Sequence, residues 1–145
     1  MKDLKADLTA GPNYGPCFTT NVRNMADCLL KWQGQIQQAL DKGGNTHNFD
    51  DVAKMVLSQQ AHIYDYDDCV LIMQVTEFPN FKTYHCFIGA GDLDAIERAI
   101  PEMHQVAAAL ECDTISISGR PGWTKAIKAH GFEHRYSTLY KKVAR

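Results

Sequence analysis

The sequence predicts a mixed α+β (α/β) fold with a central sheet and helices on both of its faces. Three observations predict it. Three strand-like runs follow one another between residues 62 and 89 with only short turns between them, which is typical of an antiparallel meander. A long helical pattern at 92–110 leads into a strand at 114–118. A short helix and a closing strand complete a β-α-β-α-β order after the meander.

The overall composition is that of an ordinary globular protein. Its 145 residues are 45% hydrophobic and 22% charged, so we expect one domain at 21–145 after an irregular arm at 1–20. No apolar run approaches the roughly 20 residues that span a bilayer, and the first residues lack the apolar run of a signal peptide. Five cysteines without a C-x-x-C pair favour reduced thiols in the cytoplasm over zinc or disulfides.

The charge is unevenly distributed along the chain. The net charge is −2, but residues 118–145 contain seven Lys and Arg against one acidic residue, which makes this part +6 and the rest −8. Such a basic segment is either a solvated surface or a patch that binds an anion, a nucleic acid or an acidic partner. The arm contains the turn-rich stretch Gly11–Pro16, so it is either an edge segment or a segment that orders on a partner.

Two helices are predicted before the sheet. Apolar residues recur every three or four positions across 21–42, which predicts one amphipathic helix that ends at Gly43-Gly44. A second helix is expected near 50–60, where Asp50 and Asp51 suit the positive end of the helix dipole.

The meander is predicted at 62–66, 69–76 and 81–89, where β-branched and aromatic residues are frequent. The run Val70–Met73 is apolar at every position, so this strand is expected to be central and covered on both faces. Pro101 lies inside the following helix and predicts a kink or a break there. Because that helix joins the strands at 81–89 and 114–118, these two strands are expected to be parallel.

The stretch from Thr114 to Val143 combines the clearest local signals. Ile115 and Ile117 alternate with polar residues, and the breaker Gly119-Arg120-Pro121-Gly122 precedes a helix. Gly131 is suited to the left-handed conformation that ends a helix. Tyr136, Thr138 and Tyr140 then alternate along the predicted closing strand.

This order of elements, with a helix that ends at Gly131-Phe132, resembles the GNAT superfamily of N-acetyltransferases over roughly residues 20–143. Within the superfamily it looks most like the GNAT-like proteins of tailed bacteriophages, some of which look like internal virion proteins. The resemblance implies that acetyl-CoA would lie where the strands at 83–89 and 114–118 splay apart. The residues implied in cofactor binding are Phe87, Ile88, Gly89, Gly91, Ser116 and Arg120.

The sequence departs from the family pattern where the pyrophosphate is held. The family loop is basic and rich in glycine, whereas the corresponding loop here contains Gly89 and Gly91 but no Arg or Gln, and Asp92 and Asp94 follow. Carboxylates beside a pyrophosphate are repulsive, although an acidic first turn is favourable for a helix without a ligand. A plain strand-to-helix turn is therefore the alternative to a cofactor loop.

The candidate catalytic groups are also unusual. The family often has a tyrosine four positions before the glycine, and this chain has Ile127 there, with Tyr136 or Tyr140 of the closing strand as the candidate substitute. Glu77 and His85 are the candidate general bases, although a lone histidine on a strand is more often a half-buried residue with a satisfied hydrogen bond. No metal-ligand spacing is present among the histidines and cysteines.

Three functions remain open from the sequence. The first is a diverged GNAT-fold protein of the phage type with a degenerate acetyl-CoA site. It would work in binding or assembly, with phage structural proteins or a second copy as partners through the arm, in the host cytoplasm or the virion. The second is an active acetyl-CoA-dependent N-acetyltransferase that modifies an amine. The third is a protein that meets nucleic acid through its basic end.

Overall fold

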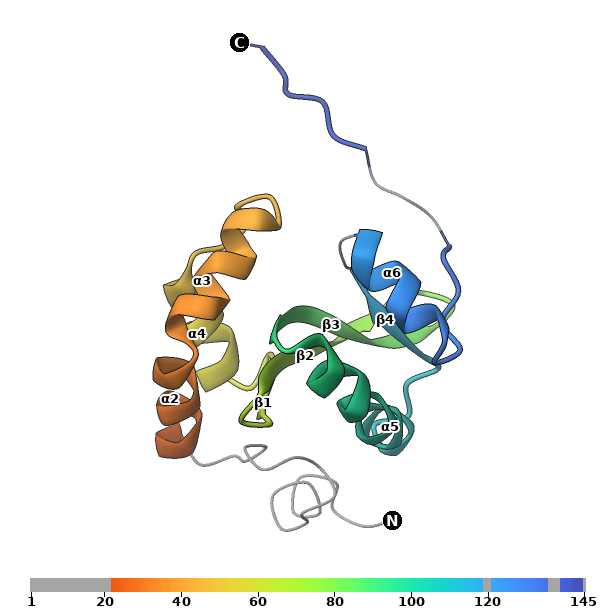
Figure 1. Ribbon diagram of the computed structural model, residues 1–145, viewed down its shortest axis with the longest axis horizontal. Helices are drawn as coiled ribbons and strands as arrows, with labels where there is room; N and C mark the ends of the chain where they lie inside the picture. The colour runs from red at the N-terminus through yellow and green to blue at the C-terminus, as the bar shows by residue number, and fades with distance from the viewer. Residues whose placement is uncertain (1–21, 119–120, 136–138, 145) are drawn as a thin grey trace.

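The computed structural model describes residues 22–118, 121–135 and 139–144 (Figure 1). The predicted arm at 1–20, Arg120 and Tyr136 lie outside the described residues. The elements follow in the order α2 (Val22–Lys31), α3 (Gln33–Lys42), α4 (Phe49–Leu57), β1 (His62–Asp65), β2 (Cys69–Glu77), β3 (Lys82–Gly91), α5 (Leu93–Ala109), β4 (Thr114–Ile117) and α6 (Pro121–Lys128).

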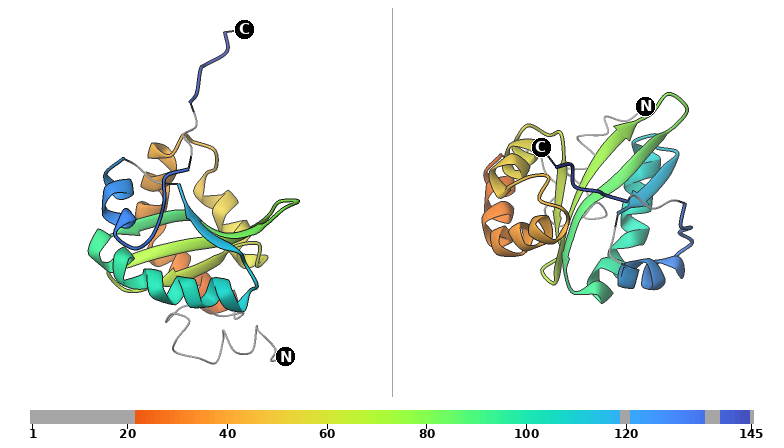
Figure 2. Two further views of the ribbon diagram at one scale, coloured as in Figure 1. Left: turned by 90° about the vertical axis from the view of Figure 1, so that its right-hand side faces the viewer. Right: turned by 90° about the horizontal axis from the view of Figure 1, so that it is seen from above.

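The four strands form one mixed sheet in the order β1-β2-β3-β4. β1 to β3 are an antiparallel meander, and β4 pairs parallel to β3, as predicted. α2, α3 and α4 cover one face of the sheet, and α5 and α6 lie on the other (Figures 1 and 2). The predicted mixed α+β fold with helices on both faces is confirmed.

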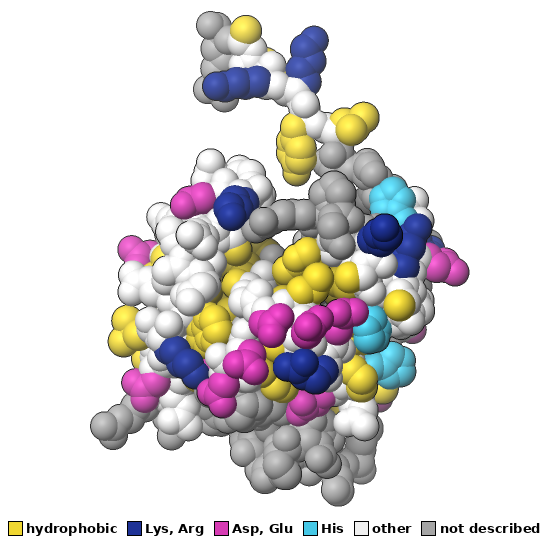
Figure 3. Space-filling view, in the orientation of Figure 1, with side chains coloured by type: hydrophobic (Ala, Val, Ile, Leu, Met, Phe, Trp, Pro, Cys, Tyr) yellow, Lys and Arg dark blue, Asp and Glu magenta, His cyan; other side chains and the backbone are white. Residues whose placement is uncertain are grey.

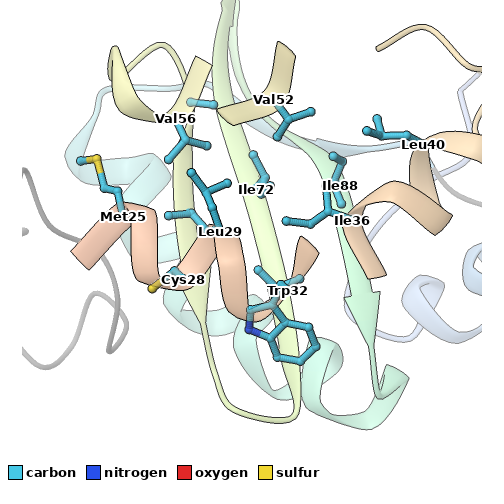
Figure 4. Close-up of a cluster of buried hydrophobic side chains, with 13 residues drawn as sticks. Met25, Cys28, Leu29, Trp32, Ile36, Leu40, Val52, Val56, Ile72 and Ile88 are labelled. Atoms are coloured by element: carbon cyan, nitrogen blue, oxygen red, sulfur yellow. The ribbon is translucent and has the colours of Figure 1, made fainter. Parts of the chain in front are cut away.

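A hydrophobic cluster fills each interface between the sheet and its helices. On the α5 side, Leu71 and Met73 of β2 pack with residues of α5. On the other side, Val70 and Ile72 pack with α2, α3 and α4 (Figure 4). Side chains alternate between the two faces of a strand, so the uninterrupted apolar run in β2 supplies both clusters. The predicted central strand is confirmed.

The polar groups inside the α5-side cluster bond to one another. Tyr64 and Tyr84 are fully buried, and their hydroxyl oxygens lie 2.8 Å apart. Nδ1 of His62 lies 2.7 Å from the Tyr84 hydroxyl. Burial raises the pKa of Tyr84 well above its usual value, so its hydroxyl keeps its proton and can donate within this chain.

The prediction of one helix over 21–42 was wrong, because the segment forms two helices separated at Trp32. Trp32 has φ −106° and ψ 11°, outside helical values, while its side chain is buried in the cluster of Figure 4. The apolar stripe continues through both helices, and this is why the sequence pattern reads as one helix. α4 begins with a reciprocal capping box between Asn48 and Asp51.

α5 continues unbroken through Pro101, so no break occurs there. Proline removes the hydrogen bond to the carbonyl four residues earlier, which belongs to Glu97. Pro101 is exposed, and the helical face that it occupies therefore points towards solvent rather than towards the sheet. Buried residues flank it on the opposite face, including Ile100 and Met103, and their packing holds the helix together.

The predicted closing strand was wrong for the residues that the structure describes. Neither 132–135 nor 139–144 is in a strand, and 136–138 lie outside the described residues. The segment Leu139–Ala144 leads away from the body of the protein in two views (Figures 1 and 2), where it has no strand beside it. The turn before it matches its prediction, since Gly131 has φ +89°.

An ion pair ties α2 to the turn after β1. Nζ of Lys31 lies 2.8 Å from Oδ2 of the buried Asp65 and 3.0 Å from Oδ1 of Asp67. Burial alone raises the pKa of Asp65, but the bonds from Lys31 and from the Asp67 amide outweigh it and hold the pKa below its usual value.

We expect this carboxylate to make stability depend on acid pH. A group whose pKa is lower in the folded state stabilises the fold above its unfolded pKa of about 4, and that stabilisation is lost as the pH falls through the folded value. Urea unfolding measured from pH 7 to pH 2 should show the free energy of unfolding falling below about pH 4. Asp65→Asn should flatten this fall, whereas the exposed Asp41→Asn should leave it unchanged. Identical pH profiles for Asp65→Asn and the wild type would contradict the assignment.

Candidate functional site

β3 extends past the end of β4 and leaves part of its backbone open. The parallel pairs run from Thr83 with Thr114 to Cys86 with Ile117, while β3 continues to Gly91. We call Phe87–Gly91 the free edge, because within the described part of the chain no strand pairs with it on the β4 side. Amide and carbonyl groups on such an edge can bind an extended ligand through backbone hydrogen bonds.

A β-bulge lies at the start of the free edge. Ile72 pairs with Ile88 and Met73 pairs with Cys86, so Phe87 has no partner opposite it on β2. Both Phe87 and Ile88 consequently pack on the α2–α4 side. A bulge bends its strand and increases the local twist, which contributes to the separation of β3 from β4. His47, in the loop after α3, places its ring edge-on to Phe87 at 5.0 Å.

Three polar side chains meet where β3 and β4 are still paired. Nδ1 of His85 lies 2.8 Å from Oγ of Ser116, which lies 3.0 Å from Oγ1 of Thr83. Oγ1 of Thr83 is also 3.3 Å from the carbonyl oxygen of Thr114, which can only accept. Oγ1 of Thr83 donates to Oγ of Ser116, and Ser116 shares a hydrogen bond with Nδ1 of His85, in which the tautomer of the imidazole sets the donor.

Burial lowers the pKa of His85 below its usual value, so the imidazole is neutral at pH 7. A neutral imidazole can take a proton from an amine, whereas a protonated one cannot. Among the described residues beside the free edge, His85 is therefore the one that is suited to accept a proton. Cys86 is not, because burial raises the pKa of its thiol to about 12 and the thiolate does not form at neutral pH.

α6 packs directly on the free edge through Trp123. A Cβ placed on Gly89 would lie 2.6 Å from Cη2 of Trp123 and 3.4 Å from Cδ2 of Leu71. The missing side chain of Gly89 thus allows the indole ring to approach the backbone of β3. Gly89 is needed here for packing, independently of any cofactor.

The loop after the free edge is closed by hydrogen bonds within the chain. Gly91 has φ +104°, and a Cβ there would lie 2.5 Å from the Asp68 carbonyl oxygen. The Asp92 amide donates to that same carbonyl at 2.9 Å, and the Asp94 amide donates to Oδ1 of Asp92 at 3.1 Å. Two amides that face outward in an anion-binding loop are therefore already satisfied.

Acidic residues from two segments of the chain lie close together at this loop. The turn of Asp67 and Asp68 is held against the start of α5 by the Asp92–Asp68 hydrogen bond. Acidic side chains gather on this face beside exposed hydrophobic ones (Figure 3). Two basic side chains lie beside this turn: Nη2 of Arg98 is 3.9 Å from Oδ2 of Asp68, and Nζ of Lys31 is 3.0 Å from Oδ1 of Asp67. At ~5 Å and an effective dielectric near 20, each carboxylate would repel a phosphate charge by about 3 kcal/mol before screening.

The acidic side chains and the internally bonded amides of this loop are unfavourable for the pyrophosphate of acetyl-CoA. Glu97, one turn into α5, is engaged as well, because its Oε1 lies 3.1 Å from Nε2 of His130. That contact joins the start of α5 to the end of α6 across the loop. The free edge could still hold an amide-containing chain, but its anion-binding end is acidic and internally bonded.

The structure brings together only part of the predicted site. Phe87, Ile88, Gly89 and Gly91 line the free edge, and Ser116 bonds to His85. Glu77 is exposed and pairs with Lys82, whereas His85 pairs with Gln74. Glu77 therefore lies three positions, or about 10 Å, along the strand from the residue opposite His85. An odd separation also places Glu77 on the opposite face. Ile127 is buried and has no hydroxyl group.

Four contributors were missed by the sequence analysis: Thr83, His47, Trp123 and Asp68. Thr83 precedes His85 by two positions, so strand alternation could have placed it on the same face. The other three come from separate elements, and no spacing signal relates them to β3. Among the described residues, no group of three or more His, Cys, Asp or Glu side chains is placed to hold a metal ion. In the same part of the chain, no helix has the length and apolar character to cross a membrane.

Comparison with solved structures places the fold. A probable acetyltransferase superposes with a TM-score of 0.62 at 8% identity, covering 82% of this chain and 94% of that one. The BH1408 protein of Bacillus halodurans, solved as a tetramutant, gives 0.57 at 14%, covering 85% and 96%. The wild-type TTHA1254 protein of Thermus thermophilus gives 0.53 at 11%, covering 78% and 91%.

No protein-family model and no curated protein matches the sequence. At these identities the structural likeness concerns the fold and not the activity. The four-stranded mixed sheet, its helices and its structural neighbours together show that the chain has a GNAT-like, acetyltransferase-type fold.

Proposed function

We propose that this chain uses its GNAT-like fold for binding and assembly rather than for acyl transfer from acetyl-CoA. The observation that carries the proposal is the loop between β3 and α5. Its Asp92 and Asp94 amides bond within the chain, and the carboxylates around them repel phosphate. This helix start is thus capped from within the chain, without a ligand.

The missing acid group supports the same conclusion. A departing thiolate needs a proton donor, and the position that often supplies one in this superfamily is the buried Ile127. Tyr136 lies outside the described residues, and Tyr140 is 90% exposed. The described residues therefore supply a proton acceptor, His85, without a matching donor beside it.

The resemblance to GNAT-like proteins of tailed bacteriophages extends the proposal to a virion-associated role. In this role the chain would meet other structural proteins or further copies of itself, through the arm at 1–20 or the basic end of the chain. Support comes from the sequence layout and from the acidic loop.

An N-acetyltransferase that acts on an amine is the second candidate. The specific observation in its favour is the neutral His85, held by Ser116 and Thr83 beside the free edge of β3. Such a group can accept a proton from an attacking amine.

Titration with acetyl-CoA tests the proposal. We expect no heat of binding and no thermal shift with the full chain up to about 1 mM ligand, which corresponds to a binding free energy weaker than about 4 kcal/mol. The matched variant is Asp92→Asn with Asp94→Asn, because asparagine caps a helix as well as aspartate does but carries no charge. If the carboxylates exclude the cofactor, this variant should bind more tightly than the wild type.

The opposite results are equally informative. Wild-type binding tighter than about 1 mM would overturn the proposal. Release of free CoA thiol in the presence of an amine, lost in His85→Gln, would establish the second candidate instead.

A further inference from the structure

Five cations near the end of the chain are exposed and have no acidic partner. These residues, which we call the basic surface, are Lys125 and Lys128 of α6 and, beyond it, Arg135, Lys141 and Lys142. In the part of the chain that the structure describes, no carboxylate lies within ion-pair distance of any of them. Lys31 and Arg98, on the body of the protein, each pair with an aspartate instead. The charge of the basic surface is therefore available to an outside anion.

The charge of this end is opposite to that of the rest of the molecule. Residues 121–144 contain five Lys and Arg and one acidic residue, a net +4, whereas residues 22–118 contain six and fourteen, a net −8. Basic side chains stand beside α6 and along the last segment, and acidic side chains gather on the body (Figure 3). A polyanion would be attracted to this end and repelled by the body, so its contact would be confined to one side of the molecule.

The helix dipole explains only part of the basic surface. Lys125 and Lys128 lie in the last turn of α6, where cations stabilise a helix without any ligand. Lys141 and Lys142 lie outside any helix, in a segment that leads away from the body (Figures 1 and 2). They give no such stabilisation, so a ligand would account for their charge better than the fold does.

An exposed aromatic ring lies within this segment. Tyr140 is 90% exposed and is followed directly by Lys141 and Lys142. Unpaired nucleic-acid bases stack on exposed aromatic rings while their phosphates meet neighbouring cations. An acidic protein would use the cations in the same way, but it has no base to place on the ring. The combination of ring and cations therefore favours a nucleic acid with unpaired bases.

We propose that the basic surface and Tyr140 bind a single-stranded nucleic acid. Phosphates of the strand pair with the lysines and the arginine, and a base stacks on the ring of Tyr140. Contacts of this kind carry no sequence information, so the binding is independent of base sequence. This interaction adds a nucleic-acid partner to the assembly role proposed above, and it does not depend on whether acetyl-CoA binds.

Fluorescence anisotropy with the full chain and a labelled DNA strand of about 20 thymidines tests the proposal. The logarithm of the affinity should fall against the logarithm of the salt concentration with a slope of roughly −2 to −3.5, because each phosphate contact on a single strand contributes about −0.7. Lys141→Gln with Lys142→Gln should make the slope shallower by about 1.4 and weaken binding. The matched control is Lys42→Gln with Lys54→Gln, which removes two charges from α3 and α4 and should leave the slope unchanged.

The role of the ring is tested separately. Tyr140→Ala should weaken binding at least about fivefold without changing the salt slope, and Tyr140→Trp should retain the affinity, because stacking needs a ring and not a hydroxyl. Circular dichroism should be the same for all these variants. Absence of binding at about 100 µM protein in low salt would overturn the proposal. So would an affinity for the duplex equal to that for the single strand, tighter binding of polyglutamate than of DNA, or the same loss of affinity in the lysine control.

Discussion

Gly91→Ala is expected to lower the free energy of unfolding by about 2 to 5 kcal/mol. The residue has φ +104°, a conformation that costs energy for any residue with a Cβ. The added carbon would also meet the Asp68 carbonyl oxygen at 2.5 Å and Cys69 Cα at 2.8 Å, and both are backbone atoms that cannot rotate away. Urea denaturation followed by circular dichroism measures the change.

Gly34→Ala is the matched control. Gly34 lies in α3, and a Cβ there would meet nothing within 4 Å. Alanine should therefore leave stability unchanged or raise it by about 0.5 to 1 kcal/mol, since it restricts the unfolded chain and favours the helix. Equal effects of the two substitutions would show that the contact between the β1–β2 turn and the end of β3 is not tight.

Ile36→Ala should cost about 2 to 5 kcal/mol of stability. Ile36 is fully buried between α3 and the sheet, where it lies near Ile72 and Ile88 (Figure 4). Removing three carbons there leaves a cavity that neighbouring elements can close only in part. Thermal and urea unfolding should both show the loss.

Two substitutions set the scale for that loss. Ile36→Val removes one carbon and should cost about 0.5 to 1.5 kcal/mol. Leu57→Ala, at the end of α4 where the side chain is 37% exposed, should cost clearly less than Ile36→Ala. A cost for Ile36→Ala no larger than that for Leu57→Ala would contradict the close packing of α3 on the sheet.

Local pattern and length predicted most of the fold. The apolar run of β2, the acidic start of α5 and the glycine after α6 are short-range signals, and the structure contains each of them. The parallel pairing of β4 followed from the helix between β3 and β4. The break expected at Pro101 does not occur. The effect of a proline depends on which way its face of the helix points, and packing sets this direction, not the neighbours in sequence.

The remaining differences come from tertiary contacts. A periodic stripe cannot reveal that Trp32 leaves the helical conformation while its side chain stays in the core. The bulge at Phe87 arises from the register between β2 and β3, which alternation alone does not define. A closing strand needs a partner as well as a pattern, and the described part of the last segment has none within its own copy.

Some residues of the candidate site could be named from the sequence, but their spatial arrangement could not. His85 and Ser116 were both named from their strands, and parallel pairing makes them neighbours. The Asp92–Asp68 bond joins segments more than twenty residues apart, so the closed state of the loop could not be foreseen. Acidity in the sequence indicated repulsion, whereas only the structure shows that the amides have partners.

The aspartate that begins α5 has a thermodynamic consequence. A protein that leaves a helix start open for a ligand becomes more stable as ligand concentration rises, because only the folded state binds. Here the Asp92 carboxylate accepts a hydrogen bond from the Asp94 amide at the helix start, and a cap of this kind contributes about 1 kcal/mol. The stabilisation is therefore present at every metabolite concentration. On the function proposed above, the folded population of this chain should be insensitive to the acyl-CoA level of its surroundings.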